Sequence, residues 1–598
     1  MSKAVFFILL LSTSLFSQTS IPKSIIDKIE SGKLAQTKQW QRLMHYRNGS
    51  SEIDDPKFFF SSSGKTNLKN ELIATVKKLI IDKSDDENST LCRYPSRSNW
   101  LLKKLPKLKQ IIKIPKCTKL KKEINSLEAK QVTLVFASAH MNSPASAFGH
   151  TFLRIDSDKD MPLLSYAVNY SAQTREDNGF IYAYQGLFGG YKGLYSIEPY
   201  TKKLKTYSDL EQRDIWEYPL NLNQEEINKM LLHIFEIKNF YADYFFLAEN
   251  CSYNLLWLLE VAKDNIELTN RFNFKAIPID TIRAIVDNNL VKETKYRPSK
   301  QKKMLELSEE IEDIPNAIAF TKSNNYNFAD IENLNRTQKA KALELATHRL
   351  QIRYGDNEID KKTYLKLFLH LLKERSRYGK IRHKPIQTPI SPREGHSSTK
   401  ATFSYAKEGE FSARIKVSYH DIYDNESGYI SGAYINFFDT SLGYKDNKFT
   451  INELNFLDIR SYAIQNAIFK PISWQVAVGG KRIFNNEINA YLKAGAGLSL
   501  GSDKLFTYAT LTPTLYYRDN GKQSISANLG LIYNQSTSFK FGLLGTREWF
   551  KDNQEIEEIE PFVTYSISKD SAINIKYISK NIDGLEEEDI TLSWFWYF

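Results

Sequence analysis

The sequence predicts a multidomain exported protein in which an α+β domain with helical flanking regions is followed by an antiparallel transmembrane β-barrel. Three observations support this prediction. The chain begins with an apolar leader, its middle part mixes short apolar strands with amphipathic helices, and its last third alternates apolar and polar residues with period two. At 598 residues the chain is also too long for one hydrophobic core, so several domains are expected.

Residues 1–17 are typical of a secretory signal peptide. They read MSKAVFFILLLSTSLFS, with a lysine near the start, an apolar run, and small polar residues before a cut after Ser17. A membrane-spanning helix is the alternative, but it needs about 20 apolar residues, and polar residues interrupt this run earlier. The mature chain is therefore expected outside the cytoplasm, where nucleic acid is not an expected partner.

The chain has three cysteines, Cys92, Cys117 and Cys251. In an oxidising compartment an odd number leaves either one free thiol or an intermolecular bridge. Cys92 and Cys117 bracket one short segment, so we predict a disulfide between them and a free thiol at Cys251.

Much of the formal charge of +11 comes from one segment, since nine lysines fall between Lys103 and Lys122. A solvated face is the simpler interpretation. The alternative is docking on anionic lipid headgroups, which contributes roughly 1 kcal/mol per lysine near such a surface.

Four regions are predicted between the leader and the barrel. Residues 18–130 form a helical N-terminal region, because apolar residues recur at three- and four-residue spacing. Residues 131–263 form the α+β domain, with strands in QVTLVFASA, HTFLRI and LLSYAVNY, a glycine-rich loop in YQGLFGGYKG, and helix from 224 to 263. Residues 264–380 return to amphipathic helix, and the proline-rich residues 381–400 form a linker.

Residues 401–598 are predicted to form an outer-membrane β-barrel of about ten strands. Segments such as SWQVAVGGKRI and PFVTYSISK alternate apolar or aromatic residues with small or polar ones between turn residues. The chain ends on DITLSWFWYF, where four residues would share one face: Leu592, Trp594, Trp596 and Phe598. This ending resembles the terminal-strand signal of outer-membrane barrels. A soluble sandwich or lipocalin-like barrel is the alternative, but it seldom exposes such an aromatic stripe.

Cys251 is the candidate nucleophile. It follows Asn250, a good N-cap, and precedes a leucine-rich helical segment, so it would be the first helical residue. Unpaired amides at a helix start stabilise a thiolate, which is the reactive form. A buried structural cysteine is the alternative.

His150 is the candidate base for this thiol, because imidazole exchanges protons near neutral pH. It opens the predicted strand HTFLRI directly after Gly149, and His140 is the rival candidate. A structural, hydrogen-bonded strand histidine is the alternative interpretation.

The segments FGHTFLRI and NCSYNLL together resemble the family of periplasmic domains named after Lnb, a lipoprotein N-acyltransferase. The resemblance extends to WQRLMHYRNG, CRYPSRSNWL, GLFGGYKGLY and RDIWEYPL, and covers most of residues 35–265. A histidine strand that precedes Asn-Cys also resembles the permuted papain-like enzymes of the NlpC and lecithin:retinol acyltransferase type. This resemblance implies a permuted papain-like fold for residues 131–263, with Cys251 as nucleophile and His150 as base.

In such enzymes a third polar residue on the next strand orients the imidazole. Asn169 is the preferred candidate, and Asp156, in the following turn, is the alternative. We also predict substrate contacts for Asn250 and Gly149, and for Gly189 and Gly190 of the glycine-rich loop. Ordinary turns explain the loop glycines equally well.

No cofactor or metal is predicted, because the sequence has no Cys-x-x-Cys, His-Glu-x-x-His or acidic calcium-loop motif. The favoured function is a periplasm-facing thiol acyltransferase of the outer membrane, with phospholipid and lipoprotein as substrates. A cell-wall amidase or peptidase with the same Cys-His pair is the second hypothesis. A noncatalytic assembly or binding protein with a buried Cys251 is the third.

Overall fold

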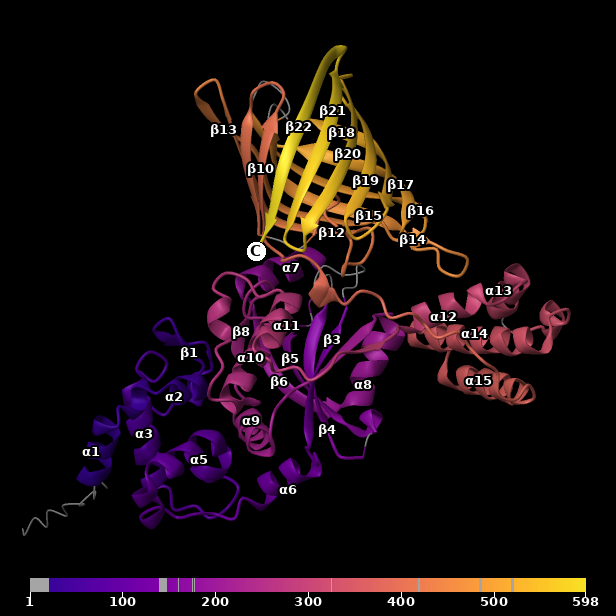
Figure 1. Ribbon diagram of the computed structural model, residues 1–598. Helices are drawn as coiled ribbons and strands as arrows, with labels where there is room; N and C mark the ends of the chain where they lie inside the picture. Colours follow the sequence, from indigo (N-terminus) through magenta and orange to yellow (C-terminus); the bar gives the residue numbers. More distant parts are fainter. Residues whose placement is uncertain are drawn as a thin grey trace, which may run out of the picture.

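The computed structural model describes residues 21–138, 148–159, 161–174, 176, 178–323, 325–417, 420–482, 487–517 and 521–598. The predicted signal peptide and His140 lie outside these ranges. A β-barrel stands above an α+β domain, and helical regions lie to either side of that domain (Figure 1).

The N-terminal helical region includes α1 (Lys23–Ser31), α2 (Lys38–Leu43), α3 (Leu68–Ile81), α4 (Thr90–Arg93), α5 (Pro95–Lys104) and α6 (Thr118–Ser126). A buried guanidinium joins this region to the α+β domain: Arg97 contacts Glu71 of α3 at 3.0 Å and Glu236 of α9 (Gln224–Ile237) at 2.5 Å. Because all three charges are buried and paired, loss of one partner would leave an uncompensated charge.

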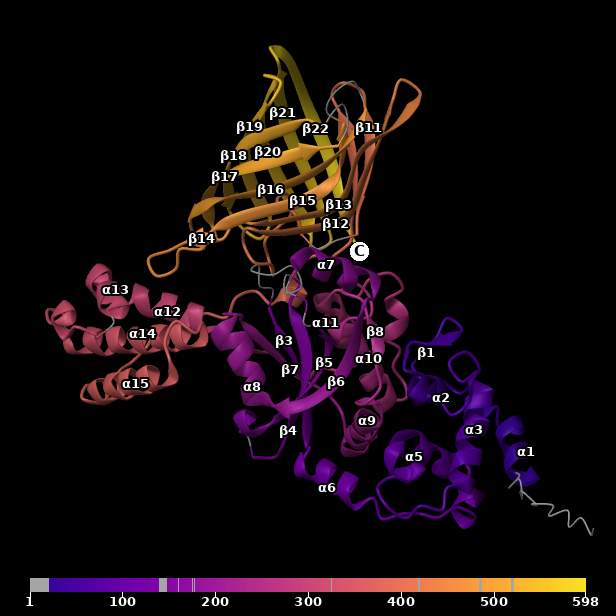
Figure 2. The ribbon, with the colours of Figure 1, turned by 180° about the vertical axis from the view of Figure 1, so that it is seen from behind.

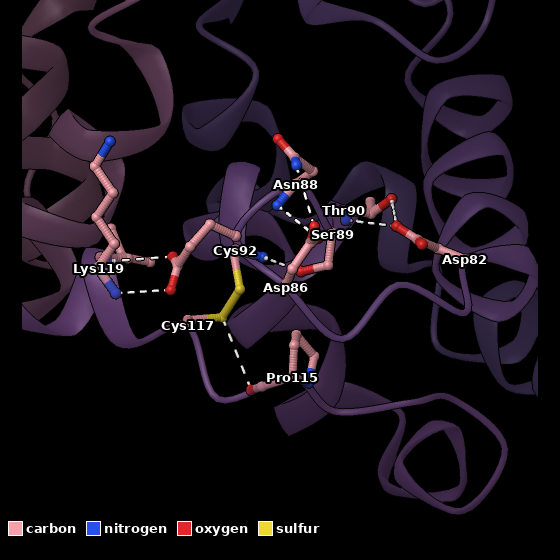
Figure 3. Close-up of a disulfide and its surroundings, with 11 residues drawn as sticks. Asp82, Asp86, Asn88, Ser89, Thr90, Cys92, Pro115, Cys117 and Lys119 are labelled. Carbon is pink, nitrogen blue, oxygen red and sulfur yellow. Dashed lines mark hydrogen bonds between the residues drawn. A yellow bond between two sulfur atoms is a disulfide. The ribbon is translucent and has the colours of Figure 1, made fainter.

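Cys92 and Cys117 form the predicted disulfide, with their Cα atoms 5.4 Å apart (Figure 3). The bond connects α4 to the residue that precedes α6. Cys251 is the free cysteine, as predicted.

The lysine-rich segment between Lys103 and Lys122 lies at the end of the molecule opposite the barrel, as the positions of α5 and α6 show in both views (Figures 1 and 2). Some of its lysines pair with neighbouring acids, such as Lys103 with Glu225 and Lys113 with Asp85. This position favours a solvated face and does not support docking on the membrane that holds the barrel.

The α+β domain contains a seven-stranded sheet in the order β8-β6-β5-β4-β3-β7-β9, and every neighbouring pair is antiparallel. The strands are β3 (Gln131–Ala137), β4 (His150–Asp156), β5 (Tyr166–Gln173), β6 (Tyr191–Pro199), β7 (Ile215–Pro219), β8 (Ala242–Tyr244) and β9 (Lys295–Arg297). The three strands predicted from sequence are β3, β4 and β5. The fully buried helix α10 (Cys251–Ala262) packs on β4 and β5.

Three details differ from the predicted organisation. The glycine-rich segment is not a simple loop, because α7 (Gly179–Phe188) occupies its first half and β6 its second. The helical stretch after residue 224 is interrupted by β8, which separates α9 from α10. The sheet also continues past residue 263, since β9 pairs with β7.

Helices α11 (Pro278–Asp287), α12 (Lys300–Glu309), α13 (Ile314–Lys322), α14 (Arg336–Gly355) and α15 (Lys361–Ser376) form the second helical region. Helices α12 to α15 have a core of their own, to which Ile468 from a loop of the barrel also contributes. No helix in the described part of the chain combines the length and apolarity needed to cross a bilayer.

In the described residues the barrel has twelve antiparallel strands, and each of these strands pairs with the next one along the chain. They are β10 (Lys400–Ala406), β11 (Phe411–Lys416), β12 (Ala433–Lys445), β13 (Lys448–Ser461), β15 (Ser473–Arg482), β16 (Ile488–Gly501), β17 (Leu505–Tyr516), β18 (Gln523–Asn534), β19 (Phe539–Phe550), β20 (Glu555–Ser568), β21 (Ser571–Ile582) and β22 (Leu585–Tyr597). The predicted number of about ten strands was too small, because long strands joined by very short turns are hard to separate in sequence.

The last strand closes the ring with the first, since β22 pairs antiparallel with β10. Leu592, Trp594, Trp596 and Phe598 are all exposed, whereas the residues between them point inward and are buried. The predicted aromatic stripe is therefore on the outer, lipid-facing surface of the barrel.

Residues 420–432, which lie between β11 and β12, are here called the plug segment. They lie inside the end of the barrel that faces the α+β domain. Tyr423 donates a hydrogen bond to Glu560 of β20, at 2.5 Å. Lys540 of β19 donates to the carbonyl oxygen of Asp424, at 2.8 Å, and Tyr597 of β22 donates to its carboxylate, at 2.7 Å. The segment is thus bonded to strands on several sides of the barrel.

The α+β domain packs against this mouth of the barrel. Phe148, just before β4, contacts Phe437 of β12 with ring centroids 5.4 Å apart. Arg283 of α11 donates to the carbonyl oxygens of Pro392 and Gly395 in the linker, at 3.1 and 2.7 Å. The start of β4 consequently lies at the barrel-facing end of the domain.

Candidate functional site

Cys251 is the first residue of α10, and Asn250 is its N-cap, as predicted. The Asn250 side-chain oxygen accepts hydrogen bonds from the amides of Ser252 and Tyr253, at 3.0 and 3.3 Å. Its amide nitrogen donates to the carbonyl oxygens of Phe246 and Ala276. The polar groups of Asn250 are therefore used within the protein, where they hold the helix start in place.

His150 is the first residue of β4, and Gly149 determines how the chain enters that strand. Gly149 has φ +84°, and a Cβ there would lie 2.4 Å from the Phe136 ring. Both the conformation and the close approach require glycine. This accounts for the Gly-His pair at the strand start by backbone geometry.

Asn169 lies on the adjacent strand β5, and its side-chain oxygen is 2.6 Å from Nε2 of His150. An amide oxygen only accepts hydrogen bonds, so Nε2 carries the hydrogen and Nδ1 is left with a lone pair. Asp156, the alternative partner, bonds instead to Thr133, Arg154 and Ser165 at the other end of β4.

Cys251 interacts electrostatically with the neighbouring His150. Burial raises the pKa of this thiol, but His150 and the backbone amide of Thr151 lower the pKa by more than burial raises it. The net result is a pKa of about 7, below the ordinary 9.0. A substantial fraction of Cys251 is therefore thiolate at neutral pH.

Two tyrosines complete the surroundings of the thiol. The amide of Cys251 donates to the hydroxyl of Tyr244, at 3.0 Å, and the proximity of Tyr244 helps to lower the pKa of the thiol. Burial and the charge of Cys251 raise the pKa of Tyr244 well above its ordinary value, so the hydroxyl keeps its proton. Tyr207 stacks on the His150 ring with centroids 5.2 Å apart. Sequence reasoning missed both tyrosines.

A buried guanidinium lies within electrostatic reach of the thiol. Arg213 is 3% exposed, and the charge of Cys251 contributes to its pKa, which burial lowers overall. Its Nη2 pairs with Glu211, whereas Nε and Nη1 have no hydrogen-bond partner among the described residues. These two N–H groups are suited to an oxyanion such as phosphate.

The predicted glycines of the substrate site are explained by packing. A Cβ on Gly189 would lie 2.3 Å from the ring of Phe245, and one on Gly190 would lie 2.8 Å from Gln185. Substrate contact by these residues stays a prediction. In the described part of the chain, one group of side chains has metal-ligand spacing, and it lies at the barrel, far along the chain from Cys251.

The fold and the site together define a class of protein. This is an outer-membrane β-barrel protein whose N-terminal part lies in the periplasm and carries a free cysteine and a histidine bonded to an asparagine.

Residues 119–288 match the family model described as the Lnb N-terminal periplasmic domain. Three further models, each described as a domain of unknown function, match residues 32–104, 294–387 and 389–597.

Several solved structures of outer-membrane channels are similar to the C-terminal part. The NanC porin shares 10% identity over 34% of this chain and 100% of its own, with a TM-score of 0.25. An outer membrane channel from Pseudomonas putida F1 shares 10% identity over 37% of this chain and 100% of its own, also with a TM-score of 0.25. No curated protein matches the chain.

Proposed function

We propose that this protein is a thiol acyltransferase that moves a fatty acyl chain from a phospholipid to the N-terminal amine of a lipoprotein. The main support is a Cys251 thiol whose pKa is lowered by the neighbouring His150, together with the hydrogen bond by which Asn169 orients that imidazole. A nucleophile, a base and an orienting group are the three parts that covalent acyl transfer needs.

In the first half-reaction the Cys251 thiolate attacks the ester carbonyl carbon of the phospholipid. A C–S bond forms, the C–O ester bond breaks, and the leaving alkoxide takes a proton from the His150 imidazolium. The products are an acyl thioester on Cys251 and a lysophospholipid. Asn169 holds His150 so that Nδ1 faces the thiol through both proton transfers.

In the second half-reaction the amine attacks the thioester. His150 removes the amine proton, an amide bond forms, and the C–S bond breaks to regenerate the thiol. Each tetrahedral intermediate carries an oxyanion, and the Cys251 amide, the Thr151 amide and the Tyr244 hydroxyl are the candidate donors beside the thiol. Such a donor typically contributes about 3 kcal/mol to the transition state.

The position of the site supports a lipid substrate. Phe148, two residues before His150, packs on Phe437 of the barrel, so the reacting groups are close to the level where the barrel enters the membrane. Helix α7 lies at the same barrel-facing end of the domain (Figure 1) and exposes Ile181, Tyr184 and Phe188 by 40%, 59% and 69%. Exposed aromatic and apolar side chains at this level suit contact with the inner leaflet.

Arg213 supports the same substrate class. Its two unused N–H groups provide a positive site for the phosphate of a phospholipid within electrostatic reach of the thiol. A cell-wall peptide does not need this group. The amidase or peptidase hypothesis uses the same thiol and imidazole but ends with attack by water, and the buried apolar side chains around the site disfavour it.

The test is a transfer assay with the full-length protein in vesicles that contain phospholipid with a labelled acyl chain. A lipopeptide with a free N-terminal amine is the acceptor. Labelled N-acyl lipopeptide is the expected product. Release of labelled free fatty acid with no labelled lipopeptide would show that the protein hydrolyses the phospholipid and does not transfer its acyl chain. Equal transfer by Cys251→Ser would exclude this thiol as the nucleophile.

A further inference from the structure

Three buried side chains meet at the periplasmic mouth of the barrel. His396 comes from the linker, and His420 and Asp424 come from the plug segment; they are 5%, 2% and 2% exposed. Nε2 of His396 lies 3.1 Å from Nδ1 of His420, and these nitrogens lie 3.8 and 3.9 Å from Oδ2 of Asp424. Three potential ligand atoms therefore lie close together at a buried position.

The neighbours of the two imidazoles determine where their hydrogens lie. Nδ1 of His396 is 2.8 Å from the carbonyl oxygen of Ser397, and Nε2 of His420 is 3.2 Å from a carboxylate oxygen of Glu426. Oxygens of these kinds accept hydrogen bonds, so these two nitrogens carry the hydrogens. The nitrogens that face each other at 3.1 Å both present lone pairs, and such an arrangement repels unless a cation lies between them.

We propose that His396, His420 and Asp424 bind a divalent transition-metal cation, for which Zn²⁺ is the best match. Two imidazole nitrogens and one carboxylate oxygen are ligands that Zn²⁺ favours. A separation of 3.1 Å is compatible with two Zn–N bonds of about 2.0–2.1 Å that meet near the tetrahedral angle. A water molecule would be the fourth ligand.

The ligands also have the supporting contacts that metal sites require. Ser397 and Glu426 orient the imidazoles, and Lys400 and Tyr597 bond to Oδ1 of Asp424, at 2.5 and 2.7 Å. Oδ2 of Asp424 accepts a hydrogen bond from the amide of Asp421, at 2.8 Å, and has a second lone pair for a metal. Three lysines and three carboxylates face this region: Lys400, Lys416, Lys540, Asp421, Asp424 and Glu426. Net charge alone therefore does not attract a cation, and selectivity comes from the nitrogen ligands.

The metal would fasten the periplasmic domain to the barrel. The linker that carries His396 is held on one side by α11, through the bonds of Arg283 to Pro392 and Gly395. Ser398 also bonds to Asp280 of that helix. On its other side the linker meets the plug segment through the histidine cluster and through Tyr429, whose hydroxyl donates to the carbonyl oxygen of His396, so one cation would join the linker to the plug segment.

The test uses full-length protein in detergent, freed of metal with a chelator and titrated with Zn²⁺ by calorimetry. We expect one Zn²⁺ per chain and a raised melting temperature, and no effect of Ca²⁺ or Mg²⁺, which prefer oxygen ligands. His396→Gln and His420→Gln should each weaken Zn²⁺ binding by about 100-fold or more. His383→Gln is the matched control, because His383 is an exposed histidine of the same linker.

Two outcomes would overturn the proposal. One is the absence of stoichiometric Zn²⁺ binding to the wild-type protein, which would mean that a shared proton joins the imidazoles. The other is undiminished binding by His420→Gln. If the variants do not fold, the wild-type protein is tested by its visible absorption with Co²⁺. Nitrogen ligation in a four-coordinate site gives intense bands, whereas free aqueous Co²⁺ does not, so the absence of intense bands would contradict the proposed site.

Discussion

The reactivity of Cys251 depends on one neighbour more than on the helix that carries it. The thiol is buried, and burial alone raises its pKa, so the N-terminus of α10 is not sufficient to make a nucleophile. The neighbouring His150 reverses this effect. Asn169 in turn determines which imidazole nitrogen faces the sulfur.

The pKa of about 7 makes a direct prediction for alkylation of Cys251 by iodoacetamide. Because the thiolate is the reactive form, the rate should rise with pH and reach half its maximum near pH 7. In His150→Ala the lowering contribution of His150 is lost while burial remains, so the midpoint should move to a higher pH. Rates are measured by mass spectrometry across pH 5 to 10.

Cys251→Ser is the control for this experiment, because Cys92 and Cys117 are joined in a disulfide and should not react. An unchanged midpoint in His150→Ala would show that His150 does not lower the pKa of the thiol.

At this scale the sequence predicted a free Cys251 capped by Asn250, and His150 next to Asn169. Their catalytic roles stay predictions. The motifs are local and their chemistry is specific. It did not predict Tyr244, Tyr207 or Arg213. These residues reach the thiol only because β8, a six-residue π-helical turn and the chain before β7 fold over the same sheet, and no spacing rule in the sequence describes that approach.

Among the elements, α7 has the most direct link to a lipid substrate. The double variant Tyr184→Ser, Phe188→Ser removes two exposed aromatic side chains and should leave the free energy of unfolding nearly unchanged. Acyl transfer from phospholipid vesicles should fall several-fold, while alkylation of Cys251 keeps its rate and pH midpoint.

Leu163→Ser, Leu164→Ser is the matched control for the α7 variant. These leucines are also exposed, but they follow the far end of β4, away from the barrel. Equal losses of transfer in both double variants would contradict a specific contact between α7 and the membrane.

The disulfide between α4 and the start of α6 gives a second prediction about elements. Closing 25 residues of chain should stabilise the N-terminal region by about 3 kcal/mol. The double variant Cys92→Ser, Cys117→Ser should therefore lower the urea midpoint of this region. Unfolding is measured by the susceptibility of residues 21–130 to proteolysis. Cys251→Ser, which keeps the bond, should have the wild-type midpoint, and equal midpoints for all three proteins would argue against stabilisation by the bond.

The glycine-rich segment shows why element boundaries were harder to predict than element types. Its glycines suggested a loop, yet Gly186 lies within α7, where a Cβ would meet the ring of Phe246 at 2.2 Å. Glycine is required there by close packing between segments about sixty residues apart. Such a requirement is invisible to local propensity.

For the whole molecule, the period-two pattern and the aromatic ending predicted the barrel and the outward direction of its last strand. The pairing of β22 with β10 gives the final residue a role in closure, because Phe598 and Thr399 exchange backbone hydrogen bonds. Deletion of Phe598 should reduce the amount of folded barrel in the outer membrane, measured by heat-modifiable mobility of membrane fractions. Phe598→Tyr, which keeps an aromatic end, is the control, and normal assembly of the deletion would contradict this role.

The sequence did not predict how the parts meet. The plug segment reads as an ordinary loop between two strands, and the histidine cluster combines it with a linker residue 24 positions earlier. Phe148 and Phe437 are almost three hundred residues apart. Contacts of this kind form when two folded domains dock, and local sequence patterns do not encode this docking.

The central claim is that Cys251 carries an acyl group during turnover. The most direct measurement is intact-protein mass spectrometry of the full-length protein after incubation with a phospholipid of defined acyl chain and no amine acceptor. A mass increase equal to one acyl group, located on Cys251 and removed by neutral hydroxylamine, is the predicted result. An unmodified Cys251 under conditions in which N-acyl lipopeptide forms on adding the acceptor would contradict covalent catalysis by this thiol.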